Sequence, residues 1–220
     1  MEHRTKDTKS SIPGNPRASV NRVTGLSKDF MANAISISNP AQERAIAWGK
    51  QAAIVIGASL FVALCARVTI PLPFTPVPLT LQNFGVLVVG FMLGSRRGFA
   101  ALALYLAEGA AGLPVFNPHG LGGVAQILGP TGGYLMAYPF VAGLAGFIFE
   151  RGRRTFASAA FGGFLAELLL FAFGLGWLAI YTGSIAQAYR FGLYWFLFAE
   201  IIKIFLAAGV AARWKRIVKA

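Results

Sequence analysis

Apolar residues follow one another almost without interruption from Ala45 onward in this 220-residue chain. Hydrophobic side chains make up 56% of the sequence and charged ones only 13%, whereas soluble domains average about 25% charged residues. A soluble domain of this composition could not cover its surface with polar groups. A disulfide framework is also excluded, because Cys65 is the only cysteine. We therefore expect an integral membrane protein.

The first 44 residues differ in kind from the rest. They are rich in Pro, Ser, Asn and Thr, carry scattered charges, and have no apolar run longer than a few residues. The stretch lacks the apolar core, about 7–15 residues long, of a secretory signal peptide. We expect residues 1–44 to form a polar, basic, disordered cytoplasmic tail. A binding arm for acidic lipid or for a partner is the alternative.

Short breaks that are charged or rich in Gly and Pro divide the remainder into apolar segments. A membrane-spanning helix needs about 20 apolar residues, and continuous apolar runs argue against the alternating pattern of a β-barrel. The fold class we expect is all-α, with residues 45–220 forming one transmembrane domain with a basic C-terminal end. Its six transmembrane helices are expected at about residues 45–66, 80–95, 98–114, 132–150, 156–180 and 191–212.

The positive charge of the chain follows from this topology. Twenty Lys and Arg residues oppose eight Asp and Glu residues, which gives a formal net charge of +12. With both termini in the cytoplasm, only Arg67 and Arg190 fall outside, and Lys203 lies within the last helix. This distribution obeys the positive-inside rule and predicts that both termini are cytoplasmic. No basic stripe interleaved with aromatic residues indicates a nucleic-acid partner.

Two expected outer loops are candidates for the boundary of a solute site. Residues 70–78 include four prolines, which make the loop extended and stiff. It is either a rigid connector or a lid, since a pre-ordered lid loses little entropy on closing. Residues 113–133 are nearly uncharged and rich in glycine, which lets backbone amides approach a ligand. The polar side chains here, which could also be simple turn formers, are Asn117, His119, Gln126, Thr131 and Tyr134.

Four charged residues are expected inside the bilayer, namely Glu108, Glu167, Glu200 and Lys203. Each costs about 2.5–3.5 kcal/mol at the bilayer centre. Glu200 and Lys203 are three residues apart and therefore share one helix face. They form either an internal ion pair or a polar floor for a ligand, and we favour the floor. Glu108 and Glu167 are either structural hydrogen-bonding groups or ligand contacts.

Small residues recur at every fourth position of the first expected helix, at Ala45, Gly49, Ala53 and Gly57. Such a stripe allows another helix to approach closely. It serves either packing within the chain or the docking of another membrane protein.

Several kinds of chemistry lack the residues they need. The chain has no Walker motif and no Ser–His or Cys–His pair at a plausible depth for nucleophilic catalysis. His119 is the only histidine beyond the tail, so a metal site would lack ligands. We expect a protein that is not an enzyme and needs no metal or cofactor.

Four motifs give the chain a resemblance to the biotin transporter BioY family over about residues 45–212. Residues 67–82 read RVTIPLPFTPVPLTLQ, residues 112–116 read GLPVF, residues 128–134 read LGPTGGY, and residues 200–203 read EIIK. The resemblance implies the substrate-binding S component of an energy-coupling-factor transporter, a six-helix protein of the inner (plasma) membrane. Its expected partners are biotin, membrane lipid, a transmembrane T component that docks on the small-residue stripe, and two cytoplasmic ATPases.

The resemblance also implies a binding site. Glu200 would accept hydrogen bonds from the ureido N–H groups of biotin, and Lys203 would donate one to an oxygen. Phe74 and the proline loop would form the lid. The alternatives are an S component for another vitamin, or a membrane scaffold whose charges are structural. The expected substrate-binding residues are Glu200, Lys203, Asn117, Tyr134, Gln82, Thr80, Phe74 and Glu167.

Overall fold

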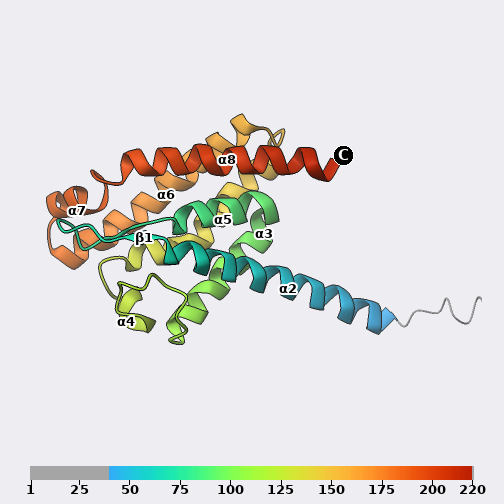
Figure 1. Ribbon diagram of the computed structural model, residues 1–220, viewed down its shortest axis with the longest axis horizontal. Helices are drawn as coiled ribbons and strands as arrows, with labels where there is room; N and C mark the ends of the chain where they lie inside the picture. The colour runs from blue at the N-terminus through green and yellow to red at the C-terminus, as the bar shows by residue number, and fades with distance from the viewer. Residues whose placement is uncertain (1–39, 220) are drawn as a thin grey trace, which may run out of the picture. The chain divides into compact units, whose positions relative to one another are not determined.

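The computed structural model describes residues 40–219, with side chains described for residues 41–214. The described part of the chain divides between residues 49 and 50 into two units. The expected tail lies outside the described residues except for residues 40–44, which are helical. The elements (Figure 1) are α2 (Pro40–Arg67), β1 (Thr69–Ile70), β2 (Leu79–Thr80), α3 (Gln82–Ala110), α4 (Gly123–Ile127), α5 (Gly132–Arg151), α6 (Phe156–Thr182), α7 (Ile185–Gly192) and α8 (Leu197–Lys219).

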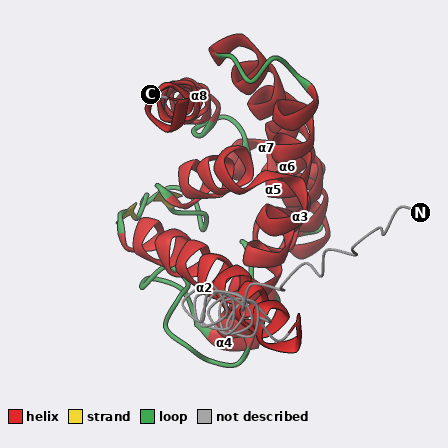
Figure 2. Cartoon of the chain, turned by 90° about the vertical axis from the view of Figure 1, so that its right-hand side faces the viewer, coloured by secondary structure: helices red, strands yellow, loops and turns green. Residues whose placement is uncertain are grey.

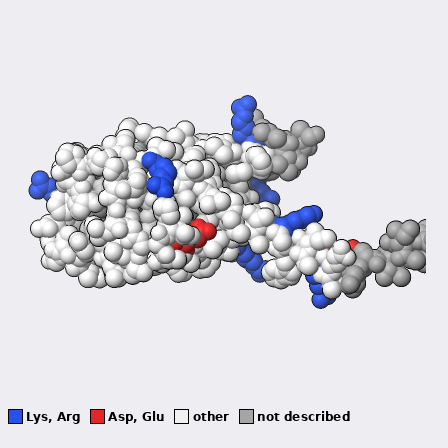
Figure 3. Space-filling model, turned by 60° about the horizontal axis from the view of Figure 1, so that its bottom comes forward, with Lys and Arg blue, Asp and Glu red and all other residues white. Residues whose placement is uncertain are grey.

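Helices dominate the described part of the chain, as Figure 2 shows. Four of them, α2, α3, α5 and α6, are long and apolar enough to cross a membrane. The α7–α8 pair, which is bent by 50°, makes a fifth candidate if it counts as one span. Large apolar side chains such as Leu64, Ile180 and Phe198 are exposed, and the face drawn in Figure 3 is mostly uncharged. The predicted helical membrane protein is confirmed.

The predicted helices at 80–95 and 98–114 correspond to the single element α3, which begins at Gln82 and ends at Ala110. Gly94 interrupts this element with φ 82° and ψ −179°, a conformation that glycine adopts without strain. A Cβ added at Gly98 would lie 3.2 Å from the Cα of Gly90, although residues eight apart in a straight helix are about 12 Å apart. The two halves of α3 therefore fold back on each other as a helical hairpin.

The α5 helix packs tightly on this hairpin through small residues. A Cβ added at Gly146 would lie 2.6 Å from the carbonyl carbon of Gly94 and 2.7 Å from the amide nitrogen of Ser95. Small residues at such positions let helix backbones approach closely. Val86, Leu102 and Val141 are fully buried nearby in the main hydrophobic core. The close packing therefore depends on the absence of side chains at the turn.

The proline loop forms the tip of a short β-hairpin. β1 and β2 pair antiparallel, with Thr69 opposite Thr80, so residues 71–78 form the tip. Val77 of this tip is buried against Leu178, Ala188 and Phe196, and the Thr75 hydroxyl donates to the carbonyl of Phe191 at 2.7 Å. The tip is thus attached to α7 and to the segment before α8.

The first prediction concerns Gly146. Gly146→Ala places a methyl group against the backbone of the α3 turn, and overpacking of this kind costs about 1–3 kcal/mol. We expect a lower thermal unfolding temperature for the purified protein in detergent. Gly209→Ala on α8 is the matched control, because a Cβ there meets nothing within 4 Å. Equal unfolding temperatures for the two variants would contradict the close packing at the turn.

Candidate functional site

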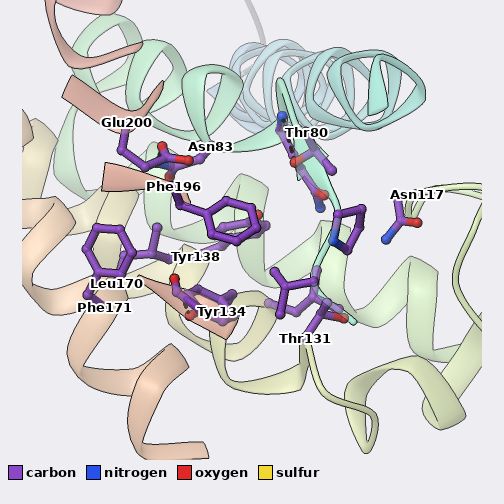
Figure 4. Close-up of a pocket in the computed structure, with 15 residues that line it drawn as sticks. Thr80, Asn83, Asn117, Thr131, Tyr134, Tyr138, Leu170, Phe171, Phe196 and Glu200 are labelled. Atoms are coloured by element: carbon purple, nitrogen blue, oxygen red, sulfur yellow. Dashed lines mark hydrogen bonds between the residues drawn. The ribbon is translucent and has the colours of Figure 1, made fainter. Parts of the chain in front are cut away.

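A cavity lies among the β-hairpin, α3, α5, α6 and the beginning of α8 (Figure 4). Its empty volume is about 550 Å³, which includes space open to solvent. Apolar and aromatic side chains dominate the wall, with a few polar groups among them. The wall consists of Val77, Pro78, Thr80, Gln82, Asn83, Asn117, Thr131, Tyr134, Leu135, Tyr138, Leu170, Phe171, Gly192, Phe196 and Glu200.

The charged pair on α8 supplies the acidic group of this wall. Lys203 Nζ donates to Glu200 Oε1 at 2.6 Å, and each residue is only 7% exposed. Glu200 lines the cavity, whereas Lys203 lies outside the wall and compensates its charge. A buried charge needs such a partner, because desolvation costs several kcal/mol per ion.

Asn83 at the start of α3 joins two buried carboxylates. Its Nδ2 donates to Glu200 Oε2 at 2.8 Å and also to Glu167 Oε1 on α6. Asn83 Oδ1 and Glu167 Oε2 are buried and have no hydrogen-bond partner. An unsatisfied buried polar atom costs about 1–3 kcal/mol, so this cluster favours a ligand or water that donates hydrogen bonds.

Two further wall residues are held by hydrogen bonds from other elements. Gln82 Nε2 donates to the Tyr105 hydroxyl at 2.6 Å, and that hydroxyl donates to the carbonyl of Val115 at 3.0 Å. The Tyr134 hydroxyl donates to the carbonyl of Gly192 at 3.0 Å. These bonds tie α3 to the loop after it, and α5 to α7, so the wall is pre-organised.

The structure brings most of the predicted substrate-binding residues together. Glu167 and Lys203 form the layer behind the wall through their bonds to Asn83 and Glu200. Phe74 does not line the cavity: it is 45% exposed, and its ring centroid lies 4.3 Å from that of Trp195. The predicted residues that do line the cavity are Glu200, Asn117, Tyr134, Gln82 and Thr80.

Sequence reasoning missed Asn83 and the aromatic wall. Asn83 directly follows Gln82, which was predicted to bind the substrate. Nothing in the sequence shows which of these two side chains contacts Glu167 and Glu200. Tyr138, Phe171 and Phe196 resemble many other aromatic residues of membrane helices. Their place in the same wall as Glu200 becomes apparent only from the packing of α5, α6 and α8.

Glu108 and the small-residue stripe do not line the cavity. Ser59 Oγ donates to Glu108 Oε2, which gives this glutamate a structural partner on α2. All four stripe residues are exposed, and a Cβ added at Gly49 or Gly57 would meet nothing within 4 Å. The stripe is therefore not used for packing among the described residues. Within residues 41–214, no cluster of His, Cys, Asp and Glu could hold a metal ion.

The fold and the cavity define a helical membrane protein with a small-molecule site, and the comparisons with known proteins specify its family. The BioY family matches residues 37–220. The biotin transporter BioY of Thermotoga maritima is 35% identical over 164 residues, covering 74% of this chain and 96% of that protein. The biotin transporter BioY of Rhizobium etli is 36% identical over 162 residues, covering 69% and 84%.

A solved structure agrees with these relatives. The crystal structure of the S-component for biotin from an ECF-type ABC transporter matches with a TM-score of 0.69 at 25% sequence identity. The match covers 82% of this chain and 95% of that one. The chain belongs to the BioY family.

The second prediction concerns Asn83. Asn83→Leu removes the amide that bonds both Glu167 and Glu200, and loss of hydrogen bonds to charged groups costs about 1.5–3 kcal/mol each. We expect a marked fall in the thermal unfolding temperature in detergent. Adding Glu167→Leu should recover part of this loss. In the double variant, the buried carboxylate that Asn83→Leu leaves without a hydrogen-bond donor is itself removed. Additive losses in the double variant would contradict the coupling of Asn83 and Glu167.

Proposed function

We propose that this chain captures biotin from outside the cell as the S component of an energy-coupling-factor transporter. The observation that carries the proposal is a buried acidic cluster at one end of a mostly apolar cavity. The ureido ring of biotin offers two N–H donors. Glu200 and the unpartnered Oδ1 of Asn83, both from residues that line the cavity, are the acceptors they require, and Glu167 lies behind Asn83.

The rest of the cavity suits the apolar part of biotin. Tyr138, Leu170, Phe171 and Phe196 provide aromatic and aliphatic walls, and burial of apolar surface contributes about 25 cal/mol per Å². A vitamin without the ureido donors would leave Asn83 Oδ1 without a partner, and unsatisfied buried polar atoms are costly. A scaffold without a solute has no use for such a cluster beside a cavity.

Six membrane spans account for the charge pattern. The two halves of α3 would cross separately, with the Gly94 turn at the inner surface, and α2, α5, α6 and the α7–α8 pair complete the set. The Ser95 hydroxyl bonds Glu150 at 2.8 Å near the end of α5, which supports an inner position for both. Both termini are then cytoplasmic in the inner (plasma) membrane, and the β-hairpin lies outside.

The β-hairpin tip would act as the lid. Val77 and Pro78 close one side of the cavity. The contact between Phe74 and Trp195 and the bond from Thr75 to the Phe191 carbonyl hold the tip in place. A few interactions of this kind could break to admit biotin. Phe74 would therefore act on the lid from outside rather than touch the ligand.

Energy for transport would come from partner proteins. The exposed stripe at Ala45, Gly49, Ala53 and Gly57 would dock a transmembrane T component, which in turn binds two cytoplasmic ATPases. The stripe offers a surface without bulky side chains, as close helix contacts require.

The third prediction tests the site. Lys203→Ala leaves the buried Glu200 charge uncompensated and should weaken biotin binding in detergent by at least about a hundredfold, as unpaired buried charges cost about 3–5 kcal/mol. An analogue altered in the ureido ring should bind wild type as poorly as biotin binds the variant. Lys50→Ala is the control, because Lys50 is exposed. Unchanged binding by a folded Lys203→Ala protein would exclude this site.

The fourth prediction separates docking from capture. Gly57→Leu fills the exposed stripe with a bulky side chain and should impair assembly with the T component while biotin affinity stays within about twofold. Co-purification with the T component and equilibrium binding measure the two effects. Gly176→Leu on α6 is the matched control, since Gly176 is also exposed and a Cβ there meets nothing within 4 Å. Equal assembly of both variants would contradict docking at the stripe.

A further inference from the structure

An open groove lies between the second half of α3 and α5. Its empty volume is about 890 Å³, which includes the open space in front of it. The groove shares no wall residue with the cavity beside Glu200, so the two are separate features of the molecule. Its wall includes Ser95, Arg96 and Phe99 of α3 and Phe140, Gly143 and Phe147 of α5.

Aromatic rings form the apolar part of this wall. Phe99, Phe140 and Phe147 are all exposed, although α3 and α5 are both candidate membrane spans. The rings of Phe99 and Phe140 pack edge to edge-on face, with their centroids 5.4 Å apart. Gly143 leaves room in the groove, because a Cβ added there would come no closer than 3.6 Å to Phe99. An apolar groove that is open along a membrane span suits a hydrocarbon chain.

Positive charge lies at one end of the groove. Arg96 lines it beside the α3 turn, and the guanidinium carbon of Arg151 lies 4.6 Å from the ring centroid of Phe147. No described residue forms an ion pair with either arginine. Glu150 instead accepts a hydrogen bond from Ser95 Oγ at 2.8 Å, which holds the end of α5 against the turn. The groove therefore has two guanidinium groups without an anionic partner beside its apolar wall.

This combination defines the chemistry of a ligand. Phe140 and Phe147 are seven residues apart, so the groove extends about 10 Å along α5. A guanidinium group binds phosphate through two parallel hydrogen bonds, and basic pockets between membrane helices bind anionic lipid headgroups. A phospholipid with a net negative charge carries both the phosphate and the hydrocarbon chain that the groove requires.

We propose that this groove binds an anionic phospholipid, with the phosphate on Arg96 and one acyl chain along Phe99, Gly143 and Phe140. Arg151 adds a second positive charge at the same end, so an anionic headgroup binds more tightly than a zwitterionic one. The proposal does not depend on biotin capture. It shares with the proposed function only the topology that places the α3 turn at the inner surface, where the headgroup of an inner-leaflet lipid would lie.

The test is native mass spectrometry of the purified full chain with dioleoyl phosphatidylglycerol and dioleoyl phosphatidylcholine. The two lipids share their chains and phosphate and differ in net charge. Arg96→Gln should weaken phosphatidylglycerol binding about tenfold, because a charge-assisted hydrogen bond is lost, and phosphatidylcholine binding by less. Arg97→Gln is the matched control: it removes the same charge from an adjacent exposed position outside the wall and should change neither lipid more than about twofold.

A second variant tests the chain-binding part of the groove. Gly143→Leu places an isobutyl group in the groove and should weaken both lipids about fivefold, since apolar contacts of the chain are lost. Gly176→Leu on α6 is the control, because a Cβ there meets nothing within 4 Å and Gly176 is outside the wall. Glycerol 3-phosphate, which has the phosphate without the chains, should not displace the lipid.

Three results would overturn the proposal. They are equal phosphatidylglycerol binding by wild type and Arg96→Gln, equal losses in Arg96→Gln and Arg97→Gln, and displacement of the lipid by glycerol 3-phosphate. Equal losses would indicate a general effect of surface charge, and displacement would indicate a site for a free anion. The biotin affinity of all four variants should equal that of wild type. A wild-type protein that binds the lipid but not biotin would contradict the proposed function alone.

Discussion

The arrangement of the site depends on one buried amide. Asn83 donates to carboxylates on two other helices, so α3, α6 and α8 meet at a single polar point within an otherwise apolar interior. Lys203 compensates the charge of Glu200 at 2.6 Å. Such a cluster is expensive inside a membrane protein. Its unpartnered oxygens require hydrogen-bond donors, and the ligand that we propose would supply them.

Close backbone contacts at two glycines help to place Asn83 within hydrogen-bond distance of both carboxylates. The Gly94 turn folds α3 on itself, and Gly146 allows α5 to lie against the turn. This packing positions the first half of α3 so that its N-terminal residues, Gln82 and Asn83, line the cavity. The β-hairpin that leads into α3 brings Val77, Pro78 and Thr80 to the same wall. The β-hairpin and the helices therefore form one continuous site.

Much of this arrangement could be predicted from the sequence. Glu200 and Lys203 stood out because charges are rare in membrane helices, and their spacing of three placed them on one face. The proline loop and the glycine-rich loop were identified because their composition excludes long helices. In the family comparison, the matched range of residues 37–220 includes all of these motifs.

Other features could not be predicted for physical reasons. The two halves of α3 were expected as separate helices joined by a short turn, but the position of that turn depends on a positive φ at Gly94, one glycine among many. Asn83 is one polar residue beside another, and its role arises from contacts with helices about 84 and 117 residues away in sequence. Phe74 was expected on the ligand, but the short strands turn its ring toward Trp195.

An experimental structure of the protein with biotin bound would test the central claim most directly. The account predicts that the ureido ring lies within hydrogen-bond distance of Glu200 and Asn83, with the bicyclic body against Tyr138, Phe171 and Phe196. A ureido ring located elsewhere in a biotin-saturated protein, with Asn83 Oδ1 still without a partner, would contradict the account.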